Sequence, residues 1–237
     1  AGAGHYCVSQ PGGELGGSAA MIVMNELTAG YERQPVTRPL SGVIERGSMT
    51  AIVGANGCGK STLLKTLAGF IAPVGGSMRW QEKRPVIGWL AQRHALEAQF
   101  PLTVQDVVSM GGWPGISLLS GFRRETRLRI AGAIERVGLE SMALSTIDEL
   151  SGGQFQRMLF ARVLVQQAPL VMLDEPFTGV DEATCNVLMD LMLEMYMQGQ
   201  TLLAVLHDSE RVSRHFPQTL RLDADVPQWK TERVRVA

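Results

Sequence analysis

The chain has 237 residues, 45% of them hydrophobic, and its 22 basic and 23 acidic side chains leave a formal net charge of −1. This even balance gives no support to broad electrostatic binding of nucleic acid, so we expect no nucleic-acid partner. No run of about 18 apolar residues occurs, so the sequence predicts no transmembrane helix, and partner proteins would have to provide any membrane spans.

The N-terminal residues and the cysteines carry no recognisable chemistry. Residues 1–20 are rich in glycine and small or polar side chains and lack the apolar centre of a secretory signal, so we interpret them as a disordered tail or a cloning remnant. Cys7, Cys58 and Cys185 are too scattered for a metal cluster, and their odd number argues against a disulfide framework. We therefore expect a reducing cytoplasmic compartment.

From residue 21 onward, short apolar runs alternate with helical patterns. Strands are predicted at residues 21–24, 50–53, 85–90, 170–173 and 201–206, and helices at about 60–70 and 182–198. This alternation favours an α/β fold with a largely parallel sheet covered on both faces. Between about residues 93 and 163, prolines and glycines interrupt the pattern around a predicted amphipathic helix at 125–137, so we interpret this stretch as a mostly helical insert. No internal repeat is present, which indicates one domain.

Residues 54–61, here called the phosphate loop, match the pattern G-x-x-x-x-G-K-[ST] between a predicted strand and a predicted helix. Glycines let this backbone turn tightly and direct its N–H groups at phosphate oxygens, and the helix start adds a positive dipole end. Lys60 is expected to bridge the β- and γ-phosphates, and Ser61 to coordinate Mg²⁺. The predicted nucleotide-binding residues are Gly54, Ala55, Asn56, Gly57, Cys58, Gly59, Lys60, Ser61 and Thr62.

A second motif is the apolar run 170–173 followed by Asp174 and Glu175. Ligands of open α/β sheets bind outside the carboxyl ends of the strands, so these acids are predicted to lie beside the phosphate loop. Asp174 is expected to hold Mg²⁺, directly or through water. Metal coordination removes the basicity that a proton acceptor needs, so one acid cannot easily serve both purposes.

The third motif, Leu-Ser-Gly-Gly-Gln at residues 150–154, lies between the phosphate loop and the acid pair. Over about residues 21 to 222 the chain resembles the ATP-binding subunits of ABC transporters, whose signature is this run. The resemblance implies a P-loop NTPase core with a mixed, mostly parallel sheet and a helical subdomain at about 93–163, within an ATP-binding domain of residues 21–237. It also implies transport-coupled hydrolysis of ATP with Mg²⁺.

The resemblance assigns roles to three side chains that the residues alone do not explain. Glu175 matches the carboxylate that polarises the attacking water, and His207, one strand later, matches the histidine that contacts the γ-phosphate and orients water. Gln92 matches the glutamine that reaches Mg²⁺ and the same water. Catalytic roles are therefore expected for Glu175, His207 and Gln92, and metal contacts for Ser61, Gln92 and Asp174.

Two further positions keep two interpretations each. Tyr31 matches the aromatic residue that stacks on adenine, and the alternative is a core tyrosine. Asp181 matches an acid near the nucleotide, and it is also a candidate N-cap of the following helix. Both roles of Asp181 can hold together.

Ser151, Gly152, Gly153 and Gln154 precede a predicted helix that runs to about residue 167, so they lie at its positive end. In the family arrangement these residues contact the γ-phosphate of ATP bound to a second copy. Two copies then enclose two ATP molecules head to tail, and monomers hydrolyse ATP poorly. ATP closes the dimer and hydrolysis opens it.

Residues 89–93 and 99–111 look like those of importers for zinc, manganese and iron or their chelates, although Ala91 replaces a common proline. The resemblance implies integral membrane permease subunits, an extracytoplasmic solute-binding protein reached through them, and a position on the cytoplasmic face of the inner membrane. Zinc or manganese is the cargo we expect. An ATPase of another small-cargo importer or exporter, or an ABC-type assembly factor, remains an alternative.

Two other patterns favour structural interpretations. Met189, Met192 and Met195 share one helical face, which is more typical of core packing than of a metal site. The arginines at 123, 124, 127 and 129 favour a solvated helix start over a surface for lipid or DNA.

Overall fold

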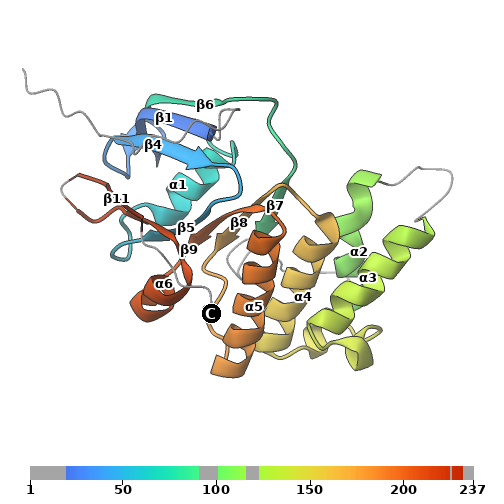
Figure 1. Ribbon diagram of the computed structural model, residues 1–237. Coiled ribbons are helices and arrows are strands. Elements are labelled where there is room, and N and C mark those ends of the chain that lie inside the picture. The colour runs from blue at the N-terminus through green and yellow to red at the C-terminus, as the bar shows by residue number, and fades with distance from the viewer. Residues whose placement is uncertain (1–19, 91–100, 116–122, 225, 232–237) are drawn as a thin grey trace, which may run out of the picture.

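The computed structural model describes residues 20–90, 101–115, 123–224 and 226–231. Figure 1 shows the layers: an antiparallel sheet, the helix α1 beneath it, a larger sheet, and helices on that sheet's far side. Among the described residues, none of the helices combines the length and the hydropathy that crossing a membrane requires.

The larger sheet has the strand order β11-β10-β5-β9-β8-β7. Its strands are β5 (Met49–Val53), β7 (Ile87–Leu90), β8 (Leu170–Asp174), β9 (Thr201–Val205), β10 (Gln218–Arg221) and β11 (Gln228–Thr231). All pairs are parallel except β10 with β11. Every residue of β8 and β9 is buried, as expected for apolar runs covered on both faces.

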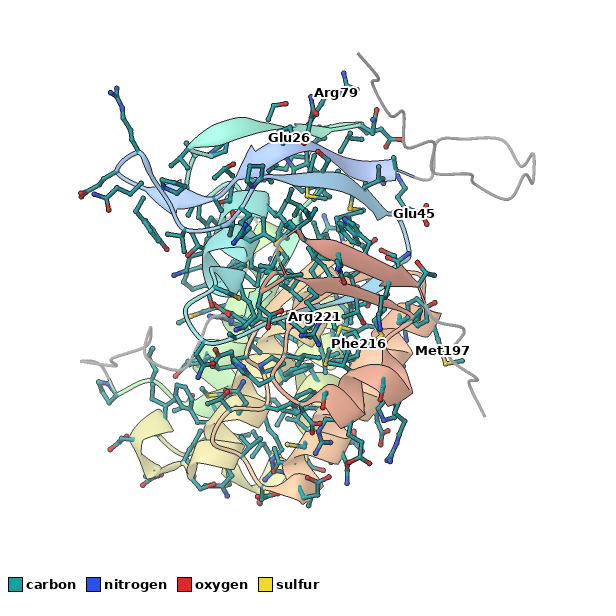
Figure 2. The ribbon with its side chains drawn as sticks, turned by 90° about the vertical axis from the view of Figure 1, so that its left-hand side faces the viewer. Glu26, Glu45, Arg79, Met197, Phe216 and Arg221 are labelled. Atoms are coloured by element: carbon teal, nitrogen blue, oxygen red, sulfur yellow. The ribbon has the colours of Figure 1, made fainter. Side chains whose placement is uncertain are left out.

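A separate sheet joins β4 (Leu40–Glu45), β1 (Ala20–Thr28) and β6 (Gly75–Trp80), all antiparallel. It is the upper sheet in Figure 2, where Glu26, Glu45 and Arg79 are labelled on it. The short hairpin of β2 (Gly30–Tyr31) and β3 (Gln34–Pro35) follows β1. This antiparallel sheet was not predicted from the sequence.

Helix α1 (Lys60–Leu67) lies between the two sheets, and its buried leucines pack with residues of β1, β4, β8 and β9. The remaining helices are α2 (Val104–Ser109), α3 (Arg124–Arg136), α4 (Gly152–Gln166), α5 (Glu182–Met197) and α6 (Ser209–His215). Short 3-10 turns occur at η2 (Met110–Gly115), η3 (Glu140–Met142) and η4 (Ile147–Glu149). Helices α2 and α3 pack on α4, which continues onto the larger sheet beside β7.

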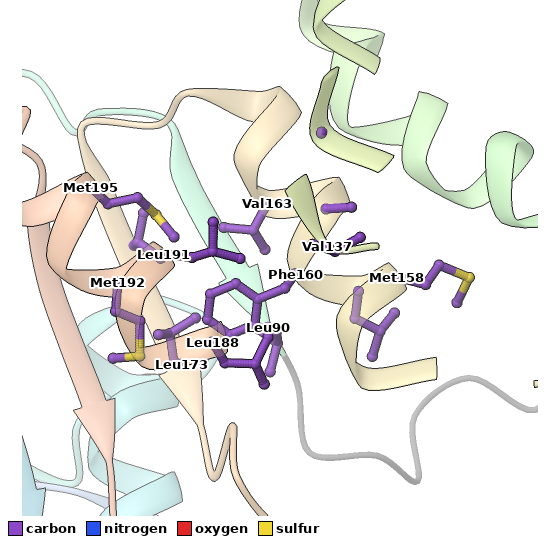
Figure 3. Packing of buried hydrophobic residues seen from close by; sticks show 14 of the residues in the cluster. Leu90, Val137, Met158, Phe160, Val163, Leu173, Leu188, Leu191, Met192 and Met195 are labelled. Carbon is purple, nitrogen blue, oxygen red and sulfur yellow. The ribbon is translucent and has the colours of Figure 1, made fainter. Parts of the chain in front are cut away.

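The core between α4, α5 and the larger sheet contains Phe160, which is fully buried. Figure 3 shows its ring directed from α4 toward Leu188 and Leu191 of α5. The interpretation of the methionine stripe as core packing is confirmed, because Met189, Met192 and Met195 are at most 3% exposed. All the strands and helices predicted from residue 21 onward are present, with ends shifted by a few residues.

Two methionines of α5 give a matched test of this packing. We expect Met192→Ala to lower the free energy of unfolding by about 2–5 kcal/mol, because Met192 is 0% exposed and its removal leaves a cavity. Met197→Ala, at a side chain that is 75% exposed, should change it by about 0.5 kcal/mol or less. Urea unfolding of both variants measures the difference, and equal losses would contradict the assignment of this face to the core.

Candidate active site

The phosphate loop requires a glycine at the residue that caps α1. Gly59 has φ 95°, in the left-handed region that favours glycine. A Cβ atom added there would lie 2.6 Å from the Thr37 Cγ2 atom and 3.1 Å from the Val36 Cγ1 atom. The loop therefore passes closely over the segment that follows β3, and only a residue without a side chain fits.

Lys60 begins α1 and is held against the same loop. Its Nζ donates hydrogen bonds to the Gly54 and Ala55 carbonyl oxygens, both at 2.8 Å, and the residue is only 5% exposed. A buried ammonium group needs such partners. These bonds hold the positive charge against the phosphate loop, where phosphate groups of a nucleotide would bind.

Ser61 and Asp174 meet across the edge of the sheet. The Ser61 Oγ donates a hydrogen bond of 2.7 Å to the Asp174 Oδ1. Asp174 ends β8 and is 2% exposed, and burial raises its pKa, although the bond from Ser61 opposes this shift. One hydroxyl and one carboxylate are oxygen ligands of the kind Mg²⁺ prefers.

The described residues contain no cluster of three His, Cys, Asp or Glu side chains that could hold a metal ion. Mg²⁺ is usually bound by one or two carboxylates together with substrate phosphates and water. Ser61 and Asp174 therefore fit a metal that arrives with a nucleotide.

Glu175 and His207 form the second contact at this edge. The His207 Nε2 lies 2.8 Å from the Glu175 Oε1, and the Thr178 hydroxyl donates to the Glu175 Oε2 at 3.2 Å. Burial opposes ionisation of Glu175, but the electrostatic interaction with His207 and the hydrogen bonds with His207 and Thr178 outweigh it and lower the pKa of this carboxyl group. Glu175 also has φ 52°, an uncommon conformation for a glutamate.

Lys60, Ser61, Glu175 and His207 line one pocket of about 640 Å³, and Asp174 is not part of its lining. Its lining comprises Val36, Asn56, Gly57, Gly59, Lys60, Ser61, Thr62, Glu175, Thr178 and His207. The structure thus brings together the phosphate loop and the acid–histidine pair. Gln92, predicted to join them, lies outside the described residues.

Tyr31 lies apart from this lining. It belongs to the β2–β3 hairpin and is 46% exposed, so the alternative of a core tyrosine is wrong. Tyr31 borders a separate pocket together with residues 71–74. Val36, which directly follows the hairpin, lines the phosphate pocket instead. The exposed Tyr31 ring remains available for stacking.

The signature residues lie at the start of α4 and are absent from the lining of the phosphate pocket. Ser151 caps the helix: its hydroxyl accepts from the Gln154 N–H, and its own N–H donates to the Gln154 Oε1 at 2.8 Å. Asp181 caps α5 through the Thr184 N–H at 2.7 Å, so its interpretation as an N-cap is confirmed. A Cβ atom on Gly153 would lie 3.7 Å from the Asp181 Oδ2, which brings the two caps close together.

Two side chains that connect distant segments of the site, Gln156 and Asp223, were not predicted from the sequence. Gln156, 3% exposed, donates to the Pro176 carbonyl oxygen at 2.8 Å and so joins α4 to the segment after Glu175. Asp223 accepts from the Ala55 N–H at 3.2 Å, just after β10. The sequence held no signal for these residues, because their partners are 20 and 168 positions away.

A match to a known protein family identifies the kind of protein that carries this site. The family model described as "ABC transporter" matches residues 37–178, which include the phosphate loop, the signature and both acids. The chain belongs to the ABC transporter family. As an ABC ATPase it binds ATP, and ATP hydrolysis is its activity.

Relatives and solved structures agree with this membership. The zinc transport system ATP-binding protein TroB of Treponema pallidum is 37% identical over 218 residues, with 90% of this chain and 82% of TroB covered. The manganese transport system ATP-binding protein MntB of Bacillus subtilis is 35% identical, with 85% and 82% covered. A metal-chelate type ABC transporter in an inward-facing conformation matches with a TM-score of 0.77 at 26% identity, covering 90% of this ABC ATPase and 83% of that chain. The dimeric cassette MJ0796 matches with a TM-score of 0.78 at 25% identity, covering 90% and 99%.

Two glycines with similar backbones test the fit of the phosphate loop. Gly199 has φ 86°, and an added Cβ atom there would have no other atom within 4 Å. Gly199→Ala therefore measures only the cost of a left-handed backbone in a residue with a side chain, and should lower the free energy of unfolding by about 1–2 kcal/mol. Gly59→Ala should cost about 1–3 kcal/mol more because of the contact with Thr37, and should also weaken ATP binding. Thermal unfolding and ATP titration measure both effects. Equal stability and equal ATP affinity of the two variants would contradict the fit.

Proposed function

We propose that this ABC ATPase powers the import of zinc or manganese across a membrane. The observation that carries the ATPase part is the pocket in which Lys60 and Ser61 face the Glu175–His207 pair. The cargo is supported by the relatives, whose names specify zinc transport for TroB and manganese transport for MntB.

In this proposal the phosphate loop holds the nucleotide. Lys60 turns from the loop carbonyls to the β- and γ-phosphates, and the N–H groups of residues 56–62 face the same oxygens. Ser61 and Asp174 would hold Mg²⁺ together with the nucleotide. Bound Mg²⁺ would neutralise charge that develops on the phosphate oxygens. This assignment of the metal ligands is supported by the 2.7 Å hydrogen bond between the Ser61 Oγ and the Asp174 Oδ1.

Glu175 is proposed to polarise the attacking water and His207 to orient it. A carboxyl group with a lowered pKa is ionised near neutral pH, and the ionised form is the one that accepts a proton. The bond to His207 fixes one carboxylate oxygen and the bond to Thr178 orients the other. Gln92 completes the set as a residue that the resemblance assigns.

A second copy of the chain is proposed to close the pocket. Ser151, Gly152, Gly153 and Gln154 lie at the N-terminus of a 15-residue helix, where backbone N–H groups favour an anion, and no residue of this run lines the pocket of its own chain. Asp181 lies beside Gly153 and belongs to the same surface. Tyr31 is proposed to stack on adenine at the exposed hairpin.

The proposed permease contact is a groove of about 900 Å³ between α2 and α3. Its lining combines charged and polar residues with apolar ones, which include Leu102, Met110, Ile130 and Ile134, and Trp113 in the same lining is 58% exposed. An exposed tryptophan beside an apolar groove is typical of a protein interface. Docking there would place the chain on the cytoplasmic face of the inner membrane, with a solute-binding protein on the other side of the permease.

Total cellular metal, measured element by element under metal limitation, tests the proposed cargo. We expect a strain that lacks this gene to contain less zinc or manganese, and the wild-type gene to restore it. Lys60→Ala should not restore it, because losing this charged contact should weaken ATP binding about ten- to a hundredfold. Lys83→Ala, at an exposed lysine, is the matched control and should restore it. Unchanged metal contents would contradict metal import.

The same strain tests whether the groove is needed for metal uptake but not for ATP hydrolysis. We expect Trp113→Asp to fail to restore the metal while the purified variant keeps ATPase activity within about twofold, as is usual for a change on an exposed surface. Val226→Asp, at a side chain that is 70% exposed and outside the groove lining, serves as the control. Full uptake by the Trp113 variant would contradict docking at this groove.

A further inference from the structure

Arg211, near the start of α6, contacts side chains on two other segments of the chain. Its Nη2 lies 2.6 Å from the Glu182 Oε2, and its Nε lies 3.1 Å from the Asp208 Oδ2. Its Nη1 lies 3.5 Å from the Asn186 Oδ1, and the guanidinium carbon lies 5.5 Å from the centre of the Phe177 ring. One side chain thus connects the starts of α5 and α6 and the segment between β8 and α5.

The environment of Arg211 selects a guanidinium group in one orientation. Its side chain is only 15% exposed, whereas the side chains of Glu182 and Asp208 are 75% and 46% exposed. Pairing with carboxylates stabilises a charge that is partly withdrawn from water. The planar fork meets acceptors in three directions and its face covers an aromatic ring, which a lysine cannot reproduce.

The partners of Arg211 are the chain neighbours of the catalytic pair. Asp208 directly follows His207, and its carboxylate also accepts the Glu210 and Arg211 N–H groups at 2.9 and 3.1 Å. Phe177 is two residues after Glu175. Glu182 directly follows Asp181, the residue beside the signature of the same chain.

The two segments leave neighbouring strands, β8 and β9, and each then begins a helix (Figure 1). A cavity of about 190 Å³ lies between them, and Glu175, His207 and Arg211 are all in its lining. Parallel pairing fixes the strand ends but not the loops that follow. The 2.8 Å contact between His207 and Glu175 therefore depends on what holds these loops together.

We propose that Arg211 is a positioning residue for ATP hydrolysis, which sets the distance between His207 and Glu175 by joining the segments that carry them. It also links this distance to the start of α5 at Asp181, and so to the surface where the second copy binds. This inference rests on the proposed roles of Glu175 and His207. Among the described residues, the side-chain contacts of Arg211 all involve these segments and none involves the phosphate loop.

A positioning residue of this kind affects turnover and not nucleotide binding. Displacing a catalytic group by about 1 Å lowers the rate by up to about a hundredfold, while the phosphate loop keeps its own contacts. A residue needed only for folding would instead lower stability and ATP affinity together. The ratio of the effect on kcat to the effect on KM therefore distinguishes the two roles.

The test compares two arginines of α6 in the full-length chain. Arg211→Met keeps the volume of the stem and removes the charged fork. Arg214→Met is the matched control, because the Arg214 side chain is 66% exposed and pairs only with Glu210, one turn earlier, among the described partners. ATPase activity is measured with MgATP at protein concentrations where specific activity no longer rises. We expect Arg211→Met to lower kcat about tenfold or more with KM within about twofold, and Arg214→Met to change neither.

A double variant tests whether Arg211 acts through its partners. If it does, adding Glu182→Ala to Arg211→Met should leave kcat within about twofold of the single variant, because residues that act as a unit are not additive. The proposal would be overturned if the loss of kcat in the double variant equalled the product of the losses caused by Arg211→Met and Glu182→Ala separately. It would also be overturned by a kcat of Arg211→Met equal to that of Arg214→Met, or by a loss of ATP affinity as large as the loss of kcat.

Glu175→Gln, measured in parallel, separates this inference from the proposed function. If Glu175→Gln retains wild-type turnover, the role assigned to Glu175 is wrong and the positioning role fails with it. If Glu175→Gln loses turnover and Arg211→Met does not, only the positioning role is overturned. Loss of turnover in both variants, with KM retained in Arg211→Met, supports both.

Discussion

The active site depends on the register of three buried parallel strands. Ala51 of β5 pairs with Ala204 of β9, and Leu203 of β9 pairs with Met172 of β8. Because both faces of these strands are buried, a slip of one residue would exchange the side chains of the two cores, so the register is strongly fixed. The carboxyl ends of the strands consequently meet at one edge, and the phosphate loop, Glu175 and His207 follow these ends.

This rigid edge explains how unfavourable local conformations persist next to it. Glu175 has φ 52°, a conformation that costs energy in a residue with a side chain. It is retained because β8 fixes the residue before it, and the contacts with His207 and Thr178 fix its carboxylate. Gly59 meets the same constraint by having no side chain, where a Cβ atom would contact Thr37.

The pKa values of the adjacent carboxyl groups at this edge are shifted in opposite directions. Burial raises the pKa of Asp174, although Ser61 donates a hydrogen bond to it. Burial opposes ionisation of Glu175 as well, but His207 and Thr178 reverse the direction and lower its pKa. Carboxyl groups whose pKa values are separated in this way commonly take different roles. The separation supports the division between a metal ligand and a group that acts on water.

The sequence predicted the parts of this arrangement that are encoded locally. A glycine-rich loop between a strand and a helix, and acids at a strand end, carry their own spacing, so residues 54–61 and Asp174 could be predicted. The antiparallel sheet, α6 and the β10–β11 hairpin could not, because their stability comes from distant partners such as Trp229, whose indole N–H donates to the Ser41 carbonyl oxygen. Arg211 gave no signal for the same reason, since its partner Glu182 lies 29 positions away.

One chain is proposed to hold most of the ATPase site, and a second chain to complete it. The most direct test is the specific ATPase activity of the full-length chain over a hundredfold dilution, with its association state followed by sedimentation in the same buffer. We expect specific activity to fall with dilution, in parallel with the loss of dimer in the presence of ATP. Constant specific activity in samples that sediment as monomers would contradict it.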